Sequence, residues 1–289
     1  MLYHYCPMSS FLKIIESSFI HCGNLYLAND PNEIMLAQNE IVSDFLKDVA
    51  GLEPHLRNNS HEFFALSFSR KKDILSQWRG YGDMGKGVML EIDLEVLKAC
   101  NYLFSQIPGN THSLNNSTFG TPVFEVFDVL YDKNEMRDKL LKTYKDFDDG
   151  TLKKSLENFD IGNIQLINFI NRINILSASY KASFYEEEKE VRCVIYSDLN
   201  NSEYKKIELR GEKCGEPLEQ KVIFLDIQGK LSPRFPLRLK FNNLIALKSV
   251  MLGPANPNIA DMVKVVLQNN GFSETDVTVS EGYFRAPTF

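Results

Sequence analysis

Three charged side chains lie two residues apart within residues 180–196, YKASFYEEEKEVRCVIY: Glu188, Glu190 and Arg192. In a β-strand, side chains at this spacing point to one face. The alternate positions are apolar and would face a core: Val191, Cys193 and Ile195. The charged face is either a solvated glutamate–arginine ladder of little energy or a functional site. Lys181, Phe184 and Tyr185 stand close by in sequence, and the residues alone leave both interpretations open.

Histidines and cysteines near the N-terminus raise the question of zinc: His4, Cys6, His21 and Cys22. Their spacing does not make two chelating pairs, because adjacent residues on a strand, such as His21 and Cys22, point to opposite faces. We therefore predict no metal site.

Nuclease chemistry is a further alternative. Glu187-Glu188-Lys189 has the E-x-K form of many metal-dependent DNA nucleases, with Asp93 as a second carboxylate. Such sites usually carry E-x-K at the end of an apolar strand, where the backbone is rigid. Here the charged run comes before the apolar residues, so the context favours other functions.

The segment after residue 77 combines the only tryptophan, Trp78, with a glycine-rich stretch, YGDMGKG, at residues 81–87. This stretch lacks the G-K-[ST] ending and the following helix of a phosphate-binding loop. We predict a glycine-rich turn leading into a strand. Trp78 is expected to be a core anchor beside the site, three residues before Tyr81.

The composition is typical of a soluble globular protein, with 44% hydrophobic and 24% charged residues among 289. A net charge of −6 argues against dense, non-specific binding of phosphates, although a local basic groove is compatible with it. The sequence shows neither a signal-peptide pattern nor an apolar run of about 18 residues. The five scattered cysteines indicate reduced thiols, so we expect a cytoplasmic protein without a membrane partner.

The pattern of apolar residues predicts the elements that would position these side chains. Strands are expected at 2–6, 62–69, 87–92, 121–131, 190–196, 204–209, 222–226, 249–252 and 276–280. Helices are expected at 9–19 behind a serine N-cap, from the turn at 29–31 through about 48, twice within 133–178, and at 256–271. The predicted fold is α+β: one domain, residues 1–289, with a mostly antiparallel sheet and a helical insertion at 133–178.

Four ordered motifs resemble the bacterial family called domain of unknown function 2971. They are LYHYCPMSSFLKIIESSFIHCGNLYLANDPNE, FALSFSRKKDILSQWRGYGDMGKGVMLEID, YKASFYEEEKEVRCVIY and VMLGP followed by VTVSEGYFR. The resemblance runs from residue 2 to about 286, interrupted by the helical insertion. Two positions depart from it: Val191 stands where an aromatic residue is common, and Pro7 where threonine is usual.

The opening motif also looks like that of ADP-ribosyltransferases that modify DNA, an analogy at the level of the fold. These enzymes use a histidine or arginine on the first strand, a hydroxyl residue on a middle strand and a late glutamate. The analogy assigns these roles to His4, to Ser67 or Ser69 with Tyr81 as a substitute, and to Glu188 or Glu190.

The chemistry of NAD cleavage gives these residue types a reason. A carboxylate bonded to the ribose hydroxyl stabilises the positive charge that develops when the bond to nicotinamide breaks. The histidine would bind the other ribose, and an aromatic side chain would hold the nicotinamide: Tyr3, Tyr5 or Phe68. The cations expected near phosphates are Arg79, Lys86, Lys181, Arg192 and Arg285.

The resemblance thus implies NAD-dependent transfer of ADP-ribose, or NAD hydrolysis, in phage defence or as a toxin, with a nucleic acid or a protein as acceptor. A nucleotide- or nucleic-acid-binding sensor without catalysis is the main alternative. We expect one cleft to bring together His4, Asn29, Asp30, Glu33, Ser69, Trp78, Tyr81, Glu188, Glu190 and Arg192. Within it, Glu190 would be the buried partner of Arg192, and Glu188, nearer the loop, would act on the ligand.

Overall fold

The computed structural model describes residues 1–27, 34, 36–50, 62–102, 123–148, 150–158, 164–197, 206–210, 217–227 and 229–282. Its large sheet consists of β1 (Leu2–Cys6), β2 (Phe19–Asn24), β3 (Glu62–Ser69), β4 (Val88–Ile92), β5 (Glu125–Asp128), β6 (Glu190–Ser197), β9 (Ile223–Ile227), β10 (Lys230–Arg238), β13 (Leu247–Leu252) and β14 (Asp276–Val279). Two short hairpins accompany it: β7 (Lys206–Arg210) with β8 (Pro217–Lys221), and β11 (Lys240–Phe241) with β12 (Leu244–Ile245).

The large sheet has the strand order β14-β13-β4-β1-β3-β2-β10-β9, with β6 pairing to β3 and β5 pairing to β6. Its pairs are antiparallel except for β13 with β14, among the strands that the structure describes. The predicted α+β class with a mostly antiparallel sheet is therefore confirmed.

Strand β3 is the point at which the sheet divides. One edge of β3 pairs with β6 along its whole length, from Glu62 to Ser69. The other edge is shared, because β2 pairs near Ala65 and β1 pairs at Ser69. No described strand pairs with residues 66–68 on that edge. The sheet thus opens between β1 and β2, and side chains rather than backbone occupy the gap.

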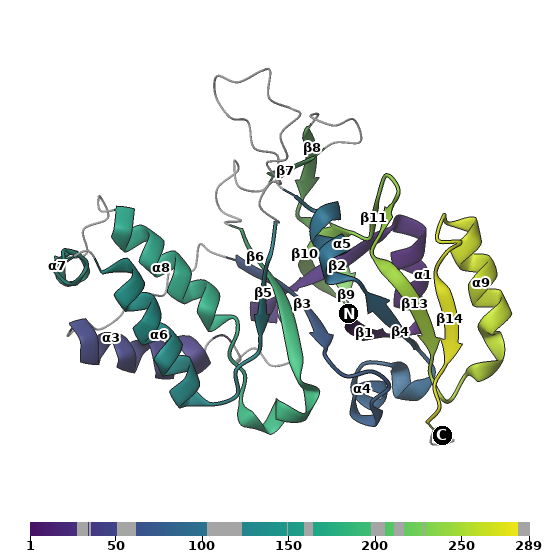
Figure 1. Ribbon diagram of the computed structural model, residues 1–289, viewed down its shortest axis with the longest axis horizontal. Helices are drawn as coiled ribbons and strands as arrows, with labels where there is room; N and C mark the ends of the chain where they lie inside the picture. The colour runs from purple at the N-terminus through teal and green to yellow at the C-terminus, as the bar shows by residue number, and fades with distance from the viewer. Residues whose placement is uncertain are drawn as a thin grey trace.

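The structure describes helices and 3-10 or π turns, of which the longer helices lie on opposite sides of Figure 1. They are α1 (Met8–Ser17), η1 (Leu25–Leu27), η2 (Ala37–Val42), α3 (Ser43–Ala50), α4 (Leu75–Gly80), η3 (Asp83–Gly85), α5 (Leu94–Cys100), α6 (Lys133–Phe147), α7 (Leu152–Asn158), α8 (Ile164–Ser177), η4 (Ser183–Glu188), η5 (Pro257–Ile259) and α9 (Ala260–Asn269).

The main core lies between the sheet and helices α1, α5 and α9. Phe11 and Ile15 of α1 pack with Leu97 of α5 and Leu267 of α9 in one buried cluster with the apolar strand residues. The apolar alternation predicted for β6 is confirmed, since this same cluster contains Val191, Cys193 and Ile195. One face of β6 is thereby fixed in the core, and its charged residues must point to the other face.

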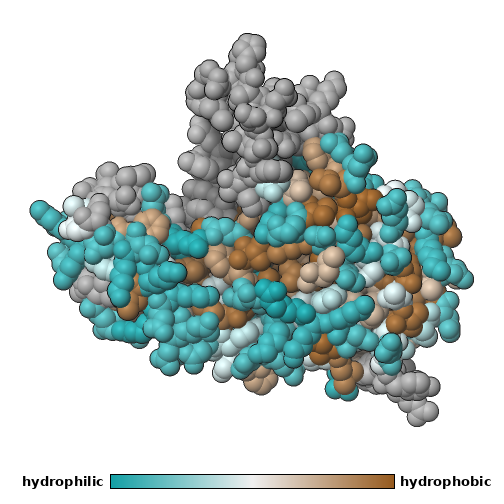
Figure 2. Space-filling model, viewed as in Figure 1, coloured by the Kyte–Doolittle hydropathy of each residue, from teal (hydrophilic) through white to brown (hydrophobic). Residues whose placement is uncertain are grey.

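A second apolar cluster joins the helices of residues 133–177 to the preceding helices. Buried residues of η2 and α3 pack with those of α6, α7 and α8, at the left of Figure 1. In Figure 2 this helical region is mostly hydrophilic, whereas hydrophobic surface gathers toward the middle of the molecule. The two ends of this helical segment are joined, because Leu130 and Tyr180 form a parallel bridge beside β6.

Several local predictions were wrong. Helix α1 ends at Ser17 rather than at Phe19, because Ser18 has a left-handed φ of 62° and turns the chain into β2. Its N-cap is Pro7 and not a serine. Residues 133–177 form three helices instead of two. Among the described strands, β2, β8, β10, β11 and β12 were not predicted.

The described cysteines agree with the expected reduced state. Cys6, Cys22, Cys100 and Cys193 are buried and unpaired, whereas Cys214 lies outside the described residues. Burial raises the pKa of the Cys6 thiol to about 12, which keeps it protonated and unreactive. Within the described part of the chain, no helix has both the length and the apolar character needed to cross a membrane.

The glycine-rich turn supplies a matched pair of substitutions. A Cβ at Gly87 would lie 2.3 Å from the Cys6 carbonyl oxygen and 3.0 Å from the Gly82 carbonyl oxygen. Backbone atoms in adjoining strands and turns yield little, so we expect Gly87→Ala to lower the free energy of unfolding by about 1–3 kcal/mol. Gly80→Ala is the control, because no atom lies within 4 Å of its added Cβ. Urea denaturation measures both; equal stability of the two variants would contradict the close approach.

Candidate functional site

A pocket of about 320 Å³ lies where the sheet opens. Residues of β1, β2, β3, β6, β10 and α4 contribute to its lining, so segments far apart in the sequence meet there. Of the residues singled out from the sequence, the pocket is lined by Tyr3, His4, Tyr5, Ser67, Phe68, Ser69, Tyr81, Lys181, Glu188, Glu190 and Arg192.

A buried ion pair on β6 forms the floor of the site. The Arg192 guanidinium donates from Nε to Glu190 Oε1 at 2.6 Å and from Nη2 to Glu190 Oε2 at 3.1 Å. Both side chains are at most 5% exposed. Arg192 also donates from Nη1 to the carbonyl oxygen of Ala178, at 3.0 Å. The bidentate geometry fixes both side chains, as predicted for Glu190 as the buried partner of Arg192.

The charge of Glu190 is maintained by these cations. Burial by itself would raise the pKa of the Glu190 carboxyl, but the adjacent Arg192 guanidinium, together with Lys181, outweighs it and lowers the pKa to about 2. The amide of Glu190 donates to the hydroxyl of Tyr131 at 2.9 Å, which fixes the start of the strand.

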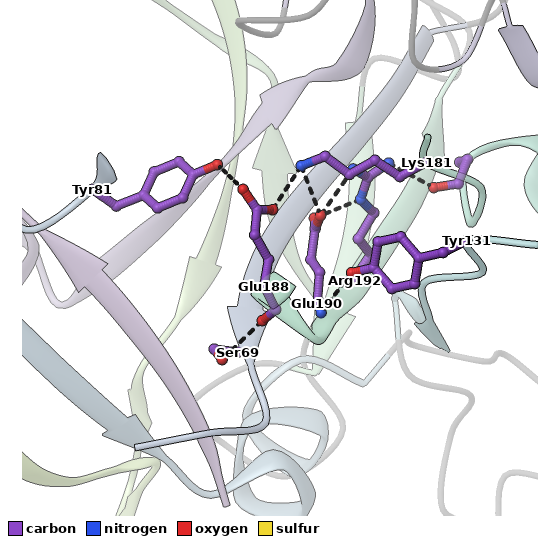
Figure 3. A network of polar contacts seen from close by, with 8 residues as sticks. Ser69, Tyr81, Tyr131, Lys181, Glu188, Glu190 and Arg192 are labelled. Atoms are coloured by element: carbon purple, nitrogen blue, oxygen red, sulfur yellow. Dashed lines mark hydrogen bonds and ion pairs between the residues drawn. The ribbon is translucent and has the colours of Figure 1, made fainter. Parts of the chain in front are cut away.

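Lys181 connects the two glutamates (Figure 3). Its ammonium donates to Glu188 Oε2 at 2.8 Å and to Glu190 Oε2 at 3.2 Å, and it lies 4.5 Å from the centre of the Tyr185 ring. Its side chain is only 5% exposed. The carboxylate of Glu188 also accepts a hydrogen bond from the hydroxyl of Tyr81, at 3.0 Å. Glu188 is therefore held from two sides.

The backbone at Glu188 differs from the expected strand. Glu188 is the last residue of the 3-10 segment η4, and Lys189 follows with a left-handed φ of 44°. This reversal lets the chain enter β6 at Glu190 while both glutamates still reach Lys181. The expectation that strand alternation alone aligns Glu188 with Glu190 was wrong. A turn, and not the pleat, brings the two side chains together.

His4 bridges the opening in the sheet. Its Nδ1 donates to the carbonyl oxygen of Ser67 at 3.0 Å, on the part of β3 that lacks a strand partner at that edge. Because a carbonyl can only accept, Nδ1 carries the proton and Nε2 of the neutral ring is an acceptor. Burial lowers the pKa of His4, against a smaller raising effect of the Ser67 bond, so the neutral ring is favoured.

The hydroxyl residues have different environments. Ser69 is buried and donates to the backbone oxygen of Glu188 at 3.0 Å, so it supports the turn. Ser67 lies on the exposed part of the pocket and helps to lower the pKa of Glu190. Burial, followed by the nearby Glu188, raises the pKa of Tyr81, which keeps its hydroxyl a donor. Tyr5 accepts from the amide of Ile74 and is committed to structure.

Trp78 does not line the pocket, contrary to its inclusion in the expected cleft. It is 1% exposed and lies with Tyr5, Met89 and Met251 in a small apolar cluster. Its indole donates to Asp73 Oδ1 at 2.7 Å. The burial of a large ring with its one donor satisfied makes Trp78 a core residue beneath the site. Phe68 belongs to the pocket lining, but the residue is only 3% exposed and packs into the main core.

The remaining expected residues are not at the pocket or are not described. Arg79 and Lys86 are exposed and do not line it. Outside the described residues lie Asn29, Asp30, Glu33 and Arg285. Among the lining residues that the sequence did not single out, three have polar side chains: Asn24, Gln77 and Arg234. The sequence predicted Lys181 as a cation near phosphates and not as the residue that links Glu188 to Glu190. Its position at the start of the third motif is the signal that could have indicated a place in the site.

The nuclease residues are not assembled. The carboxylate of Asp93 caps helix α5 by accepting from the amides of Glu95 and Val96, and Glu187 is exposed on η4. Neither lines the pocket. Among the described residues, no three His, Cys, Asp or Glu side chains are grouped so that they could hold a metal ion.

The described lining carries more positive than negative charge. Its cations are Lys181, Arg192 and Arg234, and its carboxylates are Glu188 and Glu190. With His4 neutral, one cationic charge is in excess. A pocket of this kind favours an anionic ligand, and its carboxylates can still accept from hydroxyl groups, because each oxygen has two lone pairs.

Residues 77–193 match a family model. The family is described as Protein of unknown function (DUF2971). The match spans α4 to the first half of β6 and therefore includes Lys181, Glu188 and Arg192. It supports the resemblance to this family for these residues, whereas the first and last motifs lie outside it. No curated protein and no solved structure matches the chain.

The buried ion pair predicts how stability depends on pH. Because the pKa of Glu190 is lowered to about 2, its charge stabilises the fold above the ordinary carboxyl pKa, and this stabilisation is lost as the pH falls from about 4.5 toward 2. We expect Glu190→Gln to lower the free energy of unfolding by about 3 kcal/mol near neutral pH, since Arg192 stays buried without its anion. The difference from the wild type should shrink in acid.

Glu188→Gln is the matched control for this measurement. Its amide can still accept from Tyr81 or Lys181, and its side chain is 14% exposed, so a smaller loss of stability is expected. Chemical denaturation across the acidic range measures both variants. Equal losses, or a difference for Glu190→Gln that does not change with pH, would contradict the assignment.

Proposed function

We propose that the protein cleaves the bond between nicotinamide and ribose in NAD and transfers ADP-ribose to an acceptor or to water. The observation that carries this proposal is the carboxylate of Glu188, held at the pocket by Tyr81 and Lys181. A fixed carboxylate is what stabilises positive charge on a ribose ring as its bond to a leaving group breaks.

In the proposed reaction, the bond between ribose and nicotinamide breaks, and a bond between the same ribose carbon and the acceptor or water forms. The electron pair of the ribose–nitrogen bond leaves with nicotinamide, which departs neutral, and the ribose becomes oxocarbenium-like. Glu188 accepts a hydrogen bond from a ribose hydroxyl and stabilises this charge. The acceptor or water then adds to the same carbon and releases its proton to solvent. Hydrolysis thus converts NAD and water into ADP-ribose, nicotinamide and a proton.

The other residues have supporting roles in this proposal. Glu190 and Arg192 hold Lys181 and the start of β6, so they position Glu188 instead of reacting. His4 presents a neutral acceptor at Nε2 for the second ribose or for the carboxamide of nicotinamide. Tyr3, partly exposed at the pocket, supplies an aromatic surface. The volume of about 320 Å³ is at the lower end for ligand pockets and suits one half of a dinucleotide.

A sensor without catalysis is the second candidate, because one observation favours it. Both pocket carboxylates already have cationic partners within the protein, Glu188 with Lys181 and Glu190 with Arg192. A charge network that is satisfied before a ligand arrives suits a preformed binding pocket as well as an enzyme. In that case ADP-ribose or NAD would raise the melting temperature while NAD stays intact.

Nicotinamide release tests the proposed reaction directly. Purified protein is incubated with NAD, alone and with DNA, RNA or protein as acceptor, and free nicotinamide is separated by chromatography. We expect release by the wild type and a loss of at least about 100-fold in Glu188→Gln, the scale seen when one transition-state contact is removed. The melting temperature should change little.

Glu187→Gln provides the control, since Glu187 is the exposed neighbour and does not line the pocket. It should keep the wild-type rate. An active Glu188→Gln protein would overturn the role of Glu188. Absence of nicotinamide with every acceptor, together with a rise in melting temperature on adding NAD, would instead establish the sensor.

A further inference from the structure

Arg234 is a pocket cation that has no anionic partner in the described part of the chain. It lies on β10, half-buried, and lines the pocket. Lys181 and Arg192 are paired with glutamates, whereas no carboxylate of the described residues pairs with Arg234. Burial lowers the pKa of Arg234, more than the nearby Cys22 raises it. Its charge is thus partly removed from water, and no carboxylate of the described residues balances it.

The absence of a side chain at Gly23 leaves the space that the Arg234 guanidinium occupies. Arg234 and Gly23 are direct neighbours across the β10–β2 pair, and Gly23 in turn faces Ala65 across the β2–β3 pair. A Cβ at position 23 would lie 2.2 Å from Nη1 of Arg234. The guanidinium therefore lies directly over Gly23. All three residues line the pocket. Two small side chains in a row leave a path along which the arginine reaches across the sheet.

Gln77 is a second polar residue in the same pocket. The residue is 8% exposed, and its side-chain amide has no hydrogen-bond partner among the described residues. Buried amides in folded proteins are almost always hydrogen-bonded, so an exception at a pocket indicates a group that a ligand completes. An amide can both donate to a phosphate or hydroxyl oxygen and accept from a hydroxyl.

We propose that Arg234 anchors a phosphate group of the ligand, with Gln77 completing the hydrogen bonds of the same bound molecule. The planar fork of a guanidinium fits two oxygens of a phosphate. The excess positive charge of the pocket favours the same class of ligand. This inference deepens the proposed function, on which the identity of the molecule as a nucleotide rests. The capture of a phosphate by Arg234 is separate from the cleavage of NAD.

Calorimetric titration with inorganic pyrophosphate and with ADP-ribose tests the anchor. We expect Arg234→Gln to weaken the binding of both at least 10-fold. Nicotinamide riboside, which has no phosphate, should bind to the wild type and to Arg234→Gln equally. Lys230→Gln is the control, because Lys230 is an exposed cation on the same strand and does not line the pocket. It should bind like the wild type. Equal weakening by both substitutions would overturn the proposal.

Gly23→Ala is a second variant that keeps the charge. Its Cβ would collide with the end of a flexible side chain, so the guanidinium is displaced while the fold is retained. Weaker pyrophosphate binding with an unchanged melting temperature is expected. Unchanged binding in folded Arg234→Gln and Gly23→Ala proteins refutes the anchor, even if NAD is cleaved. Pyrophosphate binding that depends on Arg234, without release of nicotinamide, supports the anchor and refutes the proposed reaction.

Discussion

The buried contact of Arg192 with Glu190 links the parts of the molecule on which the pocket depends. Arg192 lies on a strand whose apolar face is fixed in the main core, and it reaches the carbonyl of Ala178 just after helix α8. Through Glu190 it also holds Lys181, and through Lys181 it holds Glu188. Sheet, helical cluster and turn η4 therefore meet at one charged group. Removing either partner of an ion pair so buried leaves the other charge buried and unpaired, which costs stability.

The division of the sheet at β3 is the second constraint. A strand that is paired continuously on one edge and only at its ends on the other leaves backbone groups to be satisfied by side chains. His4 satisfies the carbonyl of Ser67 in this way, and the bond also sets the tautomer of the ring. The same gap that requires a polar side chain creates the space that a ligand could occupy. The way in which β1 and β2 share one edge of β3 therefore explains both the His4–Ser67 bond and the position of the pocket.

The sequence predicted well where local pattern and burial agree. Strand β3 was placed at residues 62–69, and the two faces of β6 were assigned correctly, because strict alternation of apolar and charged residues has one stable solution at a sheet. Prediction from the sequence failed where a single backbone angle determines the position of a side chain. The left-handed conformation of Lys189 places Glu188 on a turn, and no periodic pattern encodes it. Arg234 was missed because Pro233 and Pro236 argue against an interior strand, whose amides should pair.

The bridge between Leu130 and Tyr180 has a consequence for how the chain can vary. The amide of Leu130 donates to Ser179 and the amide of Lys181 donates to Leu130, so the two ends of the helical segment 133–177 are joined beside β6. The contacts that join these ends do not depend on the length of the chain between them, and the entropy of closing a loop grows only slowly with length. We therefore expect this segment to tolerate changes in its length while the pocket keeps its geometry.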